Sequence, residues 1–253
     1  KIKIKNKSFY SKIVKDQKFD LIINCDSFNQ ISKKYFYNKI YKKYDSEAYI
    51  TIINHKKKIN KKAIQIFTTY GPLAFLPISS TQTSVVYSLK NNSDLINNKK
   101  LSQLDFEKLI IENNNDYEIK SFKSYQTFKL NSKILRKYYY KNILSFGEVL
   151  HKIHPLSGQG FNMSLRDIKV LLDLINEKKN LGLQVDESIY EEFEKKTKHI
   201  NLLFATGNDF IYEFFNFDNY YYKVFSKRAF DYLNNNKIFN NLVTKYADQG
   251  LNI

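Results

Sequence analysis

Residues 147–162 read Gly-Glu-Val-Leu-His-Lys-Ile-His-Pro-Leu-Ser-Gly-Gln-Gly-Phe-Asn, and this stretch holds three of the seven glycines in the 253-residue chain. An apolar segment, residues 142–146, runs into it, and apolar residues at helical spacing follow it. We therefore expect a strand, a glycine-bearing loop and a helix start, in that order. Such an arrangement can turn backbone N–H groups toward an electron-rich ligand.

The last two glycines of this stretch can be explained either by ligand binding or by the structure of the loop alone. Gly158 and Gly160 are expected where the backbone turns sharply, since glycine lets a ligand approach without a Cβ in the way. The helix expected to begin near Asn162 adds partial positive charge at its first turn, which favours an anion. For a bare Gly-x-Gly, however, a relaxed loop that only joins a strand to a helix is the simpler explanation.

The composition predicts a globular protein with a basic surface. Apolar residues make up 43% of the chain, which is enough for a sizeable core, and the net charge is +16. Only three of the 41 basic residues are arginine, and Asn, Ile, Tyr and Phe are abundant, as an AT-rich coding sequence would produce. We therefore interpret the charge as a solvated surface and expect no nucleic-acid partner. A nucleic-acid or membrane-surface module stays an alternative that the charge alone suggests.

Cysteine usage and hydropathy bear on the compartment. Cys25 is the only cysteine, so no disulfide can form within the chain, and a cytoplasmic location is expected. Because it ends an apolar run, we expect Cys25 to be a small core residue. No apolar run approaches the about 18 residues of a spanning helix. The chain begins at Lys1 within a strand-like alternation, so we expect it to be a fragment that lacks an N-terminal portion.

Several segments are typical of strands. Short strands are expected within residues 1–27, and the last of them, Phe19–Cys25, would place the carboxylate of Asp26 at a strand's C-terminal end, where α/β sheets bind ligands. Three alternating segments predict an antiparallel sheet: 48–54, 63–69 and 83–89. Between them, a Gly71-Pro72 turn and Pro77 are expected to bracket a short apolar segment.

Three serine-led segments match the capping box of a helix N-terminus: 102–105, 164–167 and 188–191. The first predicts a helix over 102–113. The helix after the glycine loop is expected to bury one apolar face, made of Leu165, Ile168, Leu171, Leu172 and Ile175. The third predicts a helix whose inner face holds Phe193, Ile200, Leu203 and Phe204.

The complete glycine stretch resembles the C-terminal flavin-binding motif of the FAD-dependent aromatic-ring hydroxylases, in particular the ubiquinone-biosynthesis hydroxylases with their para-hydroxybenzoate hydroxylase-like fold. The matching positions are Gly147, His151, His154, Pro155, Gly158, Gln159, Gly160, Asn162, Arg166 and Asp167. The resemblance implies that the acidic residue of the first pair binds ribityl hydroxyls and that the Pro-to-Asn stretch lies along the isoalloxazine ring. The implied cofactor-binding residues are Gly147, Glu148, Pro155, Gly158, Gln159, Gly160, Phe161, Asn162 and Asp26.

Two further segments extend the resemblance. Residues 20–27 are similar to the family's mid-chain Asp-Gly motif, and residues 71–77 are similar to its Gly-Pro-Leu-Ala-Leu-Leu-Pro segment. The second match implies a substrate-binding set, Gly71, Pro72, Leu73, Leu76 and Pro77. The chain departs from the family at Glu148 and Ser27, which replace aspartate and glycine, and at Lys33, which stands near an arginine. No Gly-x-Gly-x-x-Gly occurs, so the pyrophosphate-binding βαβ unit is not in this chain.

The resemblance implies a mixed α/β fold, the C-terminal part of a flavin monooxygenase. We expect a remnant of the FAD-binding domain in 1–35, a substrate-binding sheet in 36–133, the FAD strand–loop–helix in 134–185 and C-terminal helices in 186–253. The implied reaction is hydroxylation of a polyprenylated phenol in ubiquinone biosynthesis, with O2, through a flavin C4a-hydroperoxide. NAD(P)H or another donor would supply the electrons, and the fragment by itself is expected to bind FAD poorly and to be inactive.

The remaining candidates for chemistry are weaker. His151 and His154 have no clustered third ligand, so we interpret them as packing and hydrogen-bonding residues and predict no metal site. No side chain is assigned as a catalytic acid or base. Aromatic clusters in 214–222, close to basic residues, leave open a peripheral membrane role or docking in a ubiquinone-biosynthesis complex. A non-catalytic flavin-fold accessory or quinone-binding protein stays an alternative, favoured by Glu148, Ser27 and the missing βαβ unit.

Overall fold

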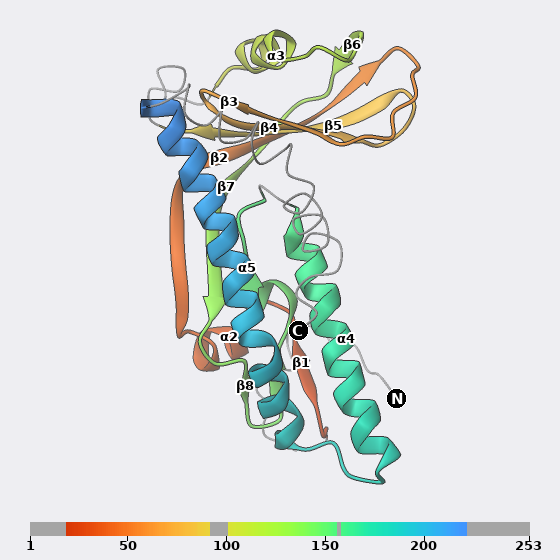
Figure 1. The fold of residues 1–253 in the computed structure, drawn as a ribbon, viewed down its shortest axis with the longest axis vertical. Coiled ribbons are helices and arrows are strands. Elements are labelled where there is room, and N and C mark those ends of the chain that lie inside the picture. The colour runs from red at the N-terminus through yellow and green to blue at the C-terminus, as the bar shows by residue number, and fades with distance from the viewer. Residues whose placement is uncertain (1–18, 92–100, 156–157, 222–253) are drawn as a thin grey trace, which may run out of the picture. The chain divides into compact units, whose positions relative to one another are not determined.

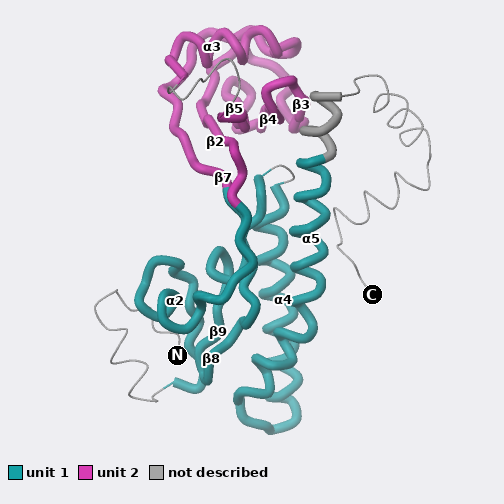
Figure 2. The backbone as a smooth tube through the Cα atoms, turned by 90° about the vertical axis from the view of Figure 1, so that its left-hand side faces the viewer, with its two compact units in different colours: residues 1–42, 131–213, 224–253 teal, residues 43–130, 214–223 magenta. Residues whose placement is uncertain are grey.

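The computed structural model describes residues 19–91, 101–155 and 158–221, with side chains as far as Glu213. Our predictions for residues 1–18 and for the aromatic side chains from 214 onward fall outside this description. The chain forms two compact units (Figure 2). Unit 1 comprises residues 1–42, 131–213 and 224–253, and unit 2 comprises residues 43–130 and 214–223. The chain passes between them in strands β2 (Lys39–His55) and β7 (Gln126–Leu135).

Unit 2 is an antiparallel sheet covered on one face by a helix (Figure 1). Its strands follow the order β3-β4-β5-β2, and β6 pairs with β2. The bounds are β3 (Ile64–Thr68), β4 (Gly71–Pro77), β5 (Gln82–Lys90), β6 (Ile119–Phe122) and α3 (Gln103–Glu112). Side chains from the sheet and from α3 share one core, in which Leu73, Phe75, Val85 and Phe106 are buried. The predicted antiparallel sheet is confirmed.

The first capping box is confirmed, whereas the turn predicted at Gly71-Pro72 lies two residues earlier in the chain. Ser102 lies just before α3 and accepts a hydrogen bond from the Asp105 N–H. The turn lies at residues 69–70, and Gly71 begins strand β4, where it pairs with Thr68 of β3. A Cβ at Gly71 would lie 2.0 Å from the Ser88 carbonyl oxygen. Glycine is therefore required here for close approach of the neighbouring strand.

Unit 1 contains a small mixed sheet in the order β1-β9-β8. Strands β1 (Ile22–Asn24) and β9 (Ile143–Ser145) run parallel, whereas β8 (Tyr139–Tyr140) is antiparallel to β9. Strand β1 is shorter than predicted and ends before Cys25, which is exposed; the expectation that Cys25 is a core residue was wrong. Three short elements complete this region: α2 (Gln30–Tyr35), the 3-10 turn η2 (Gly147–Val149) and β10 (His151–Lys152), which pairs with β7.

Two long helices, α4 (Gln159–Asn180) and α5 (Glu187–Tyr221), lie side by side in both views (Figures 1 and 2). Helix α4 begins before the expected position, so the predicted capping box at 164–167 lies inside the helix. There, Ser164 donates a hydrogen bond to the Gly160 carbonyl. Helix α5 begins at Glu187, so the predicted capping residue Ser188 lies inside the helix. The residue that caps the N-terminus is Asp186, whose carboxylate accepts a hydrogen bond from the Ser188 N–H.

The buried faces of these helices differ from the predicted ones. Helix α4 buries Met163, Asp167, Leu171 and Leu174. Three predicted core residues are instead exposed: Leu165 (48%), Ile168 (41%) and Leu172 (53%). On α5, Leu203 is also exposed, while Phe193 and Phe204 are buried as expected. Helix α4 therefore has two apolar faces, and the face that is buried is the one that contains Asp167.

The mixed α/β fold with an antiparallel sheet and C-terminal helices is confirmed, whereas the finer division into four domains stays a prediction. Across the described ranges, none of the helices combines the length and the apolar character that crossing a bilayer requires.

Candidate functional site

Two segments far apart in the sequence meet at one edge of the small sheet. Because β1 and β9 are parallel, their C-terminal ends lie at the same edge. Asp26 and Ser27 follow β1, and Gly147 and Glu148 follow β9. The Ser27 hydroxyl donates to the Glu148 carbonyl at 3.4 Å. The structure thus brings together the two acidic motifs that the sequence singled out.

The local backbone holds both carboxylates at this edge. The Asp26 carboxylate accepts a hydrogen bond from the Phe28 N–H at 2.8 Å, and the Ser32 hydroxyl donates to the Asp26 carbonyl. Gly147 has a φ of 59°, a left-handed conformation that favours glycine. The side chain of Glu148 is exposed. Both carboxylates therefore border solvent at the edge, with the Glu148 side chain reaching into it.

The glycine loop ends in a helix N-terminus that has no side-chain cap. Gly158 has a φ of 63° and is the residue before α4. The first N–H groups of a helix have no partner within it, and no acidic side chain lies in the first turn of α4. Gly160 lies in that first turn rather than at a sharp bend, which corrects the expected geometry. A Cβ there would meet Ile153 at 3.8 Å, an ordinary contact.

The other predicted loop residues are at the surface. Pro155 is exposed, and its carbonyl accepts the Gly158 N–H at 3.1 Å. The Phe161 side chain is 72% exposed. Asn162 is exposed and donates to the Gln159 side-chain oxygen at 3.3 Å.

A buried hydrogen-bonded pair, His151 and Asp167, connects the loop to the long helices. The His151 Nε2 lies 2.8 Å from the Asp167 carboxylate, and both side chains are almost completely buried. Asn201 of α5 donates to the same carboxylate at 3.3 Å. The neighbouring Arg166 guanidinium stacks 3.7 Å from the Phe204 ring centroid. The Arg-Asp pair thus holds β10, α4 and α5 together, and His151 is a hydrogen-bonding residue as expected.

The His154 side chain is also completely buried. It packs against Tyr212 with ring centroids 4.5 Å apart, and Asn208 donates to its backbone carbonyl at 2.9 Å. Burial, followed by the nearby Lys42 charge, lowers the pKa of His154 to about 4. His154 is therefore neutral at physiological pH, consistent with a packing role.

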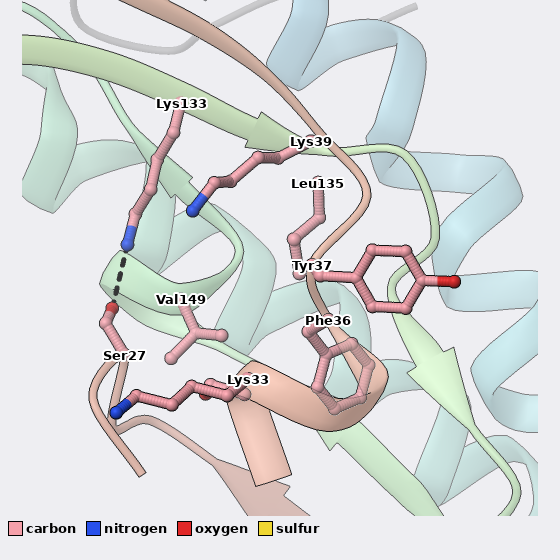
Figure 3. Close-up of a pocket in the computed structure, with 9 residues that line it drawn as sticks. Ser27, Lys33, Phe36, Tyr37, Lys39, Lys133, Leu135 and Val149 are labelled. Atoms are coloured by element: carbon pink, nitrogen blue, oxygen red, sulfur yellow. Dashed lines mark hydrogen bonds between the residues drawn. The ribbon is translucent and has the colours of Figure 1, made fainter. Parts of the chain in front are cut away.

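Next to the sheet edge lies a cavity of about 260 Å³, here called the lysine pocket (Figure 3). It is lined by Ser27, Ser32, Lys33, Phe36, Tyr37, Lys39, Lys133, Leu135 and Val149. The Lys133 ammonium donates to the Ser27 hydroxyl at 2.8 Å. Burial lowers the pKa of Lys133, with further lowering by the charges of Lys39 and Lys152. Sequence reasoning missed Lys39 and Lys133, because nothing distinguishes them among so many lysines.

The predicted substrate segment lies in unit 2, in β4. Leu73 is completely buried in the unit 2 core, so it faces α3 rather than an accessible wall. Alternation along the strand places Pro72, Ala74 and Leu76 on the opposite face. Of these, Leu76 is exposed and the other two are half-buried. Any contact of this segment with a substrate therefore falls to that second face.

Characterised relatives of this chain include ubiquinone-biosynthesis hydroxylases. The chain is 25% identical over 179 residues to the ubiquinone hydroxylase UbiL of Rhodospirillum rubrum, and 27% identical over 159 residues to the 3-demethoxyubiquinol 3-hydroxylase of Escherichia coli. These matches cover 69% and 58% of this chain but only 41% and 38% of the relatives, so the chain spans well under half of their length.

Among solved structures, the chain is similar in fold to the OxyS anhydrotetracycline hydroxylase from Streptomyces rimosus, with a TM-score of 0.63, 13% identity and coverage of 90% of this chain and 45% of the other. The PqsL structure from Pseudomonas aeruginosa, described as a probable FAD-dependent monooxygenase, gives a TM-score of 0.58 at 13% identity and covers 78% of this chain and 56% of the other.

The resemblance to ubiquinone-biosynthesis hydroxylases is confirmed by the curated relatives. Residues 18–246 match the family described as squalene epoxidase, which is most of the chain, and the chain therefore belongs to that family.

Proposed function

We propose that this chain forms part of an FAD-dependent monooxygenase that hydroxylates an aromatic ring. The proposed substrate is a polyprenyl phenol of ubiquinone biosynthesis, with O2 as co-substrate and NAD(P)H or another donor as the source of electrons. One observation carries the proposal: Asp26-Ser27 and Gly147-Glu148 meet at the carboxyl edge of the parallel strands. The named activities of the curated relatives support it.

The groups at this edge and those of the first turn of α4 suit the chemistry of a flavin nucleotide. The Glu148 and Asp26 carboxylates are acceptors for the hydroxyls of a ribityl or ribose chain. The uncapped first turn of α4 offers the N–H groups of Gln159 and Gly160 as donors. With Gly147 and Gly158, these residues would hold FAD, which supplies the redox chemistry and the activation of O2 when bound. Pro155, Phe161 and Asn162 complete the proposed contact surface.

The role of α4 in this proposal is electrostatic. A helix N-terminus carries about half a positive charge, and α4 is 22 residues long with no side-chain cap and no acidic residue in its first turn. Amides fixed in place before the reaction stabilise developing negative charge without reorganising. The amides of Gln159 and Gly160 would therefore favour the negative charge that an electron-accepting ring acquires on reduction.

The substrate side of the proposal rests on β4. Pro72 and Leu76 share the strand face opposite the unit 2 core, and Pro77 ends the strand. An apolar surface of this kind suits a prenylated ring. Because such a substrate is dissolved in lipid, the proposal includes association of a cytoplasmic protein with a membrane surface or with a ubiquinone-biosynthesis complex.

Flavin binding is tested by titrating FAD with the chain and recording absorbance difference spectra. We expect weak, saturable binding that the Gly160→Val substitution abolishes, because the branched side chain blocks approach to the first-turn amides. Gly207→Val is the matched control, since Gly207 is a helical glycine whose added Cβ would meet nothing within 4 Å. Equal binding by the Gly160→Val chain and the native chain would contradict the proposed loop contacts.

Hydroxylation is tested in the organism that makes the chain. Deletion of the coding sequence is expected to cause accumulation of a polyprenyl phenol that lacks one hydroxyl, detected by mass spectrometry. Isotope-labelled O2 should place one labelled oxygen on that ring when the native chain is restored. An unchanged quinone profile after deletion would reject the proposed reaction.

A non-catalytic accessory that binds quinones is the second candidate. It is favoured by Ser27, whose hydroxyl bonds to both Glu148 and Lys133 where the family has glycine. In the deletion strain, rescue of the quinone profile by the Gly160→Val chain would favour this candidate, because that chain would lack the proposed flavin contacts.

A further inference from the structure

We propose that a second cavity of unit 1, here called the tyrosine pocket, binds the ammonium group of an alkylamine. Its volume is about 340 Å³. Phe19 and Asp20 precede β1 and Asn142 precedes β9, so the pocket lies at the opposite end of these strands from the proposed flavin edge. It therefore does not depend on the proposed function. The lining residues are Phe19, Asp20, Tyr35, Tyr140, Lys141, Asn142, Ile143, Asp186, Glu187 and Tyr190.

Tyrosine rings from three elements form the walls of the pocket. Tyr35 of α2 and Tyr140 of β8 are stacked, with ring centroids 4.3 Å apart. Tyr190 of α5 is buried, and its hydroxyl donates to the Asp20 carbonyl at 2.6 Å, which ties the residues before β1 to this helix. The face of an aromatic ring carries negative electrostatic potential and attracts cations. These walls therefore suit a cation that has an apolar body.

Ammonium groups of the chain itself already lie over two of these rings. The Lys141 amine is 5.8 Å from the Tyr140 ring centroid, and the Lys34 amine is 5.2 Å from the Tyr35 ring centroid. Both distances are within the range of a cation–π interaction. Lys141 and Lys34 are both exposed, so their amines reach the rings from the solvent side. The stacked pair thus attracts the chemical group that the proposed ligand would bring.

The charge of the lining is negative, although the whole chain has a net charge of +16. Three carboxylates line the pocket, against the one amine of Lys141. Asp186 is engaged with Lys178 at 3.5 Å and with the Ser188 hydroxyl. Within the described ranges, the carboxylates of Asp20 and Glu187 have no hydrogen-bond or ion-pair partner. Two negative charges are therefore available to a cation that enters the pocket.

The negative potential reaches the aromatic wall. Burial, followed by the charges of Asp20, Asp186 and Glu187, raises the pKa of Tyr190 to about 12. The same carboxylates that disfavour a phenolate at Tyr190 favour a positive charge beside it. A cation therefore meets both the ring surface and the carboxylates in one place.

An alkylamine fits this arrangement better than a metal ion. A divalent metal needs several converging oxygen ligands, and none of the His, Cys, Asp and Glu side chains in the described part of the chain form such a group. An ammonium group needs only one or two charge-assisted hydrogen bonds, and its methylene groups can lie along aromatic surface. The cavity volume is near the lower end of small-molecule sites, which favours a short chain.

The test is isothermal titration calorimetry of the native chain with putrescine and with Nα-acetyl-lysine amide, at low salt. We expect saturable binding of both, and none of butanol, which lacks the charge. Asp20→Asn and Glu187→Gln should each weaken binding about tenfold, because each removes one charge-assisted contact. Glu192→Gln is the matched control, since Glu192 is also on α5 but is paired with Lys196 and lies outside the pocket. It should bind like the native chain.

Two further variants separate the ring contact and the competing amine from general charge effects. Tyr140→Phe keeps the ring and should retain the affinity, whereas Tyr140→Leu should lose most of it. Lys141→Gln removes the amine that lies over Tyr140 and should tighten binding about threefold. Thermal unfolding of every variant checks that the fold is intact.

The two ligands also identify the source of the ammonium group. Tighter binding of the lysine derivative would indicate a lysine side chain of a partner protein, and equal or tighter binding of putrescine would indicate a free amine. Lack of saturable binding of both ligands would overturn the proposal. An equal loss of affinity in Glu192→Gln and Glu187→Gln would also overturn it, because the effect would then come from overall charge.

Discussion

Asp167 is a buried carboxyl side chain in a helix, and its oxygens are hydrogen-bonded to His151 and Asn201. Removing one partner of a buried pair leaves the other polar group without compensation, at a cost of about 3 kcal/mol or more. We therefore expect Asp167→Asn to lower the free energy of unfolding by about that amount, measured by urea denaturation. Asp173→Asn, an exposed change on the same helix, should cost less than about 0.5 kcal/mol. Equal effects would contradict the anchoring role.

His154 gives the protein a predictable response to acid. Its pKa is about 4 in the folded chain, against an ordinary value of 6.5. Between these values the unfolded chain binds a proton that the folded chain does not, so stability falls as pH falls, by up to about 3 kcal/mol at pH 4. In His154→Gln the decline between pH 6.5 and 4 should be shallower, whereas exposed His199→Gln should keep the native slope. Parallel slopes for all three would refute the assignment.

At the residue scale, sequence reasoning identified the edge residues but not their environment. Asp26 and Gly147 were predictable because each follows an apolar strand. The partner of Asp167 was not, since it depends on how β10 packs against α4. The lysine pocket could not be predicted from the sequence either, because Lys39 and Lys133 come together only through tertiary structure.

The capping-box pattern predicted the N-terminus of α3 correctly but not that of α4. A capping box requires an extended residue at its first position. Ser164 is helical and bonds back to Gly160, so its pattern with Asp167 is a coincidence of spacing. The left-handed Gly158 ends the loop instead. In α3, by contrast, Ser102 is extended, and the same pattern correctly predicted the N-terminus.

The buried face of α4 can be tested with two neighbouring leucines. Leu171 is buried in the unit 1 core, whereas Leu172 is mostly exposed. Leu171→Ala should lower the free energy of unfolding by about 3 kcal/mol, because it leaves a cavity, and Leu172→Ala should cost less than about 1 kcal/mol. Chemical denaturation measures both. The reverse order would restore the face that the sequence predicted.

At the scale of the whole molecule, each unit has its own hydrophobic core. Phe106 is fully buried among unit 2 residues, and Phe193 is fully buried among unit 1 residues. We expect Phe106→Ala to reduce hydrogen-exchange protection mainly in β4 and β5, and Phe193→Ala mainly in β9 and α4, because each opens a cavity in a separate cluster. Equal loss of protection across both units in either variant would contradict this independence.

The class of fold was predictable from strand alternation, helix periodicity and the glycine stretch. The unit organisation was not, because the chain leaves unit 1 in β2 and returns to it in β7. Sequence patterns follow consecutive ranges, whereas each compact unit combines ranges that are far apart. Within unit 1, strand β1 pairs with β9, although residues 43–130 of unit 2 lie between them in the sequence.

The exposure of Cys25 has a practical consequence. As the chain's sole thiol, one residue past β1 and beside Asp26, it offers a single attachment point for a maleimide dye without any engineered cysteine. Partial burial of the sulfur raises the pKa of the thiol, so conjugation should proceed faster in mildly alkaline buffer. A fluorophore placed there would sit at the rim of the edge formed by β1 and β9, where its emission would respond to the arrival of any molecule.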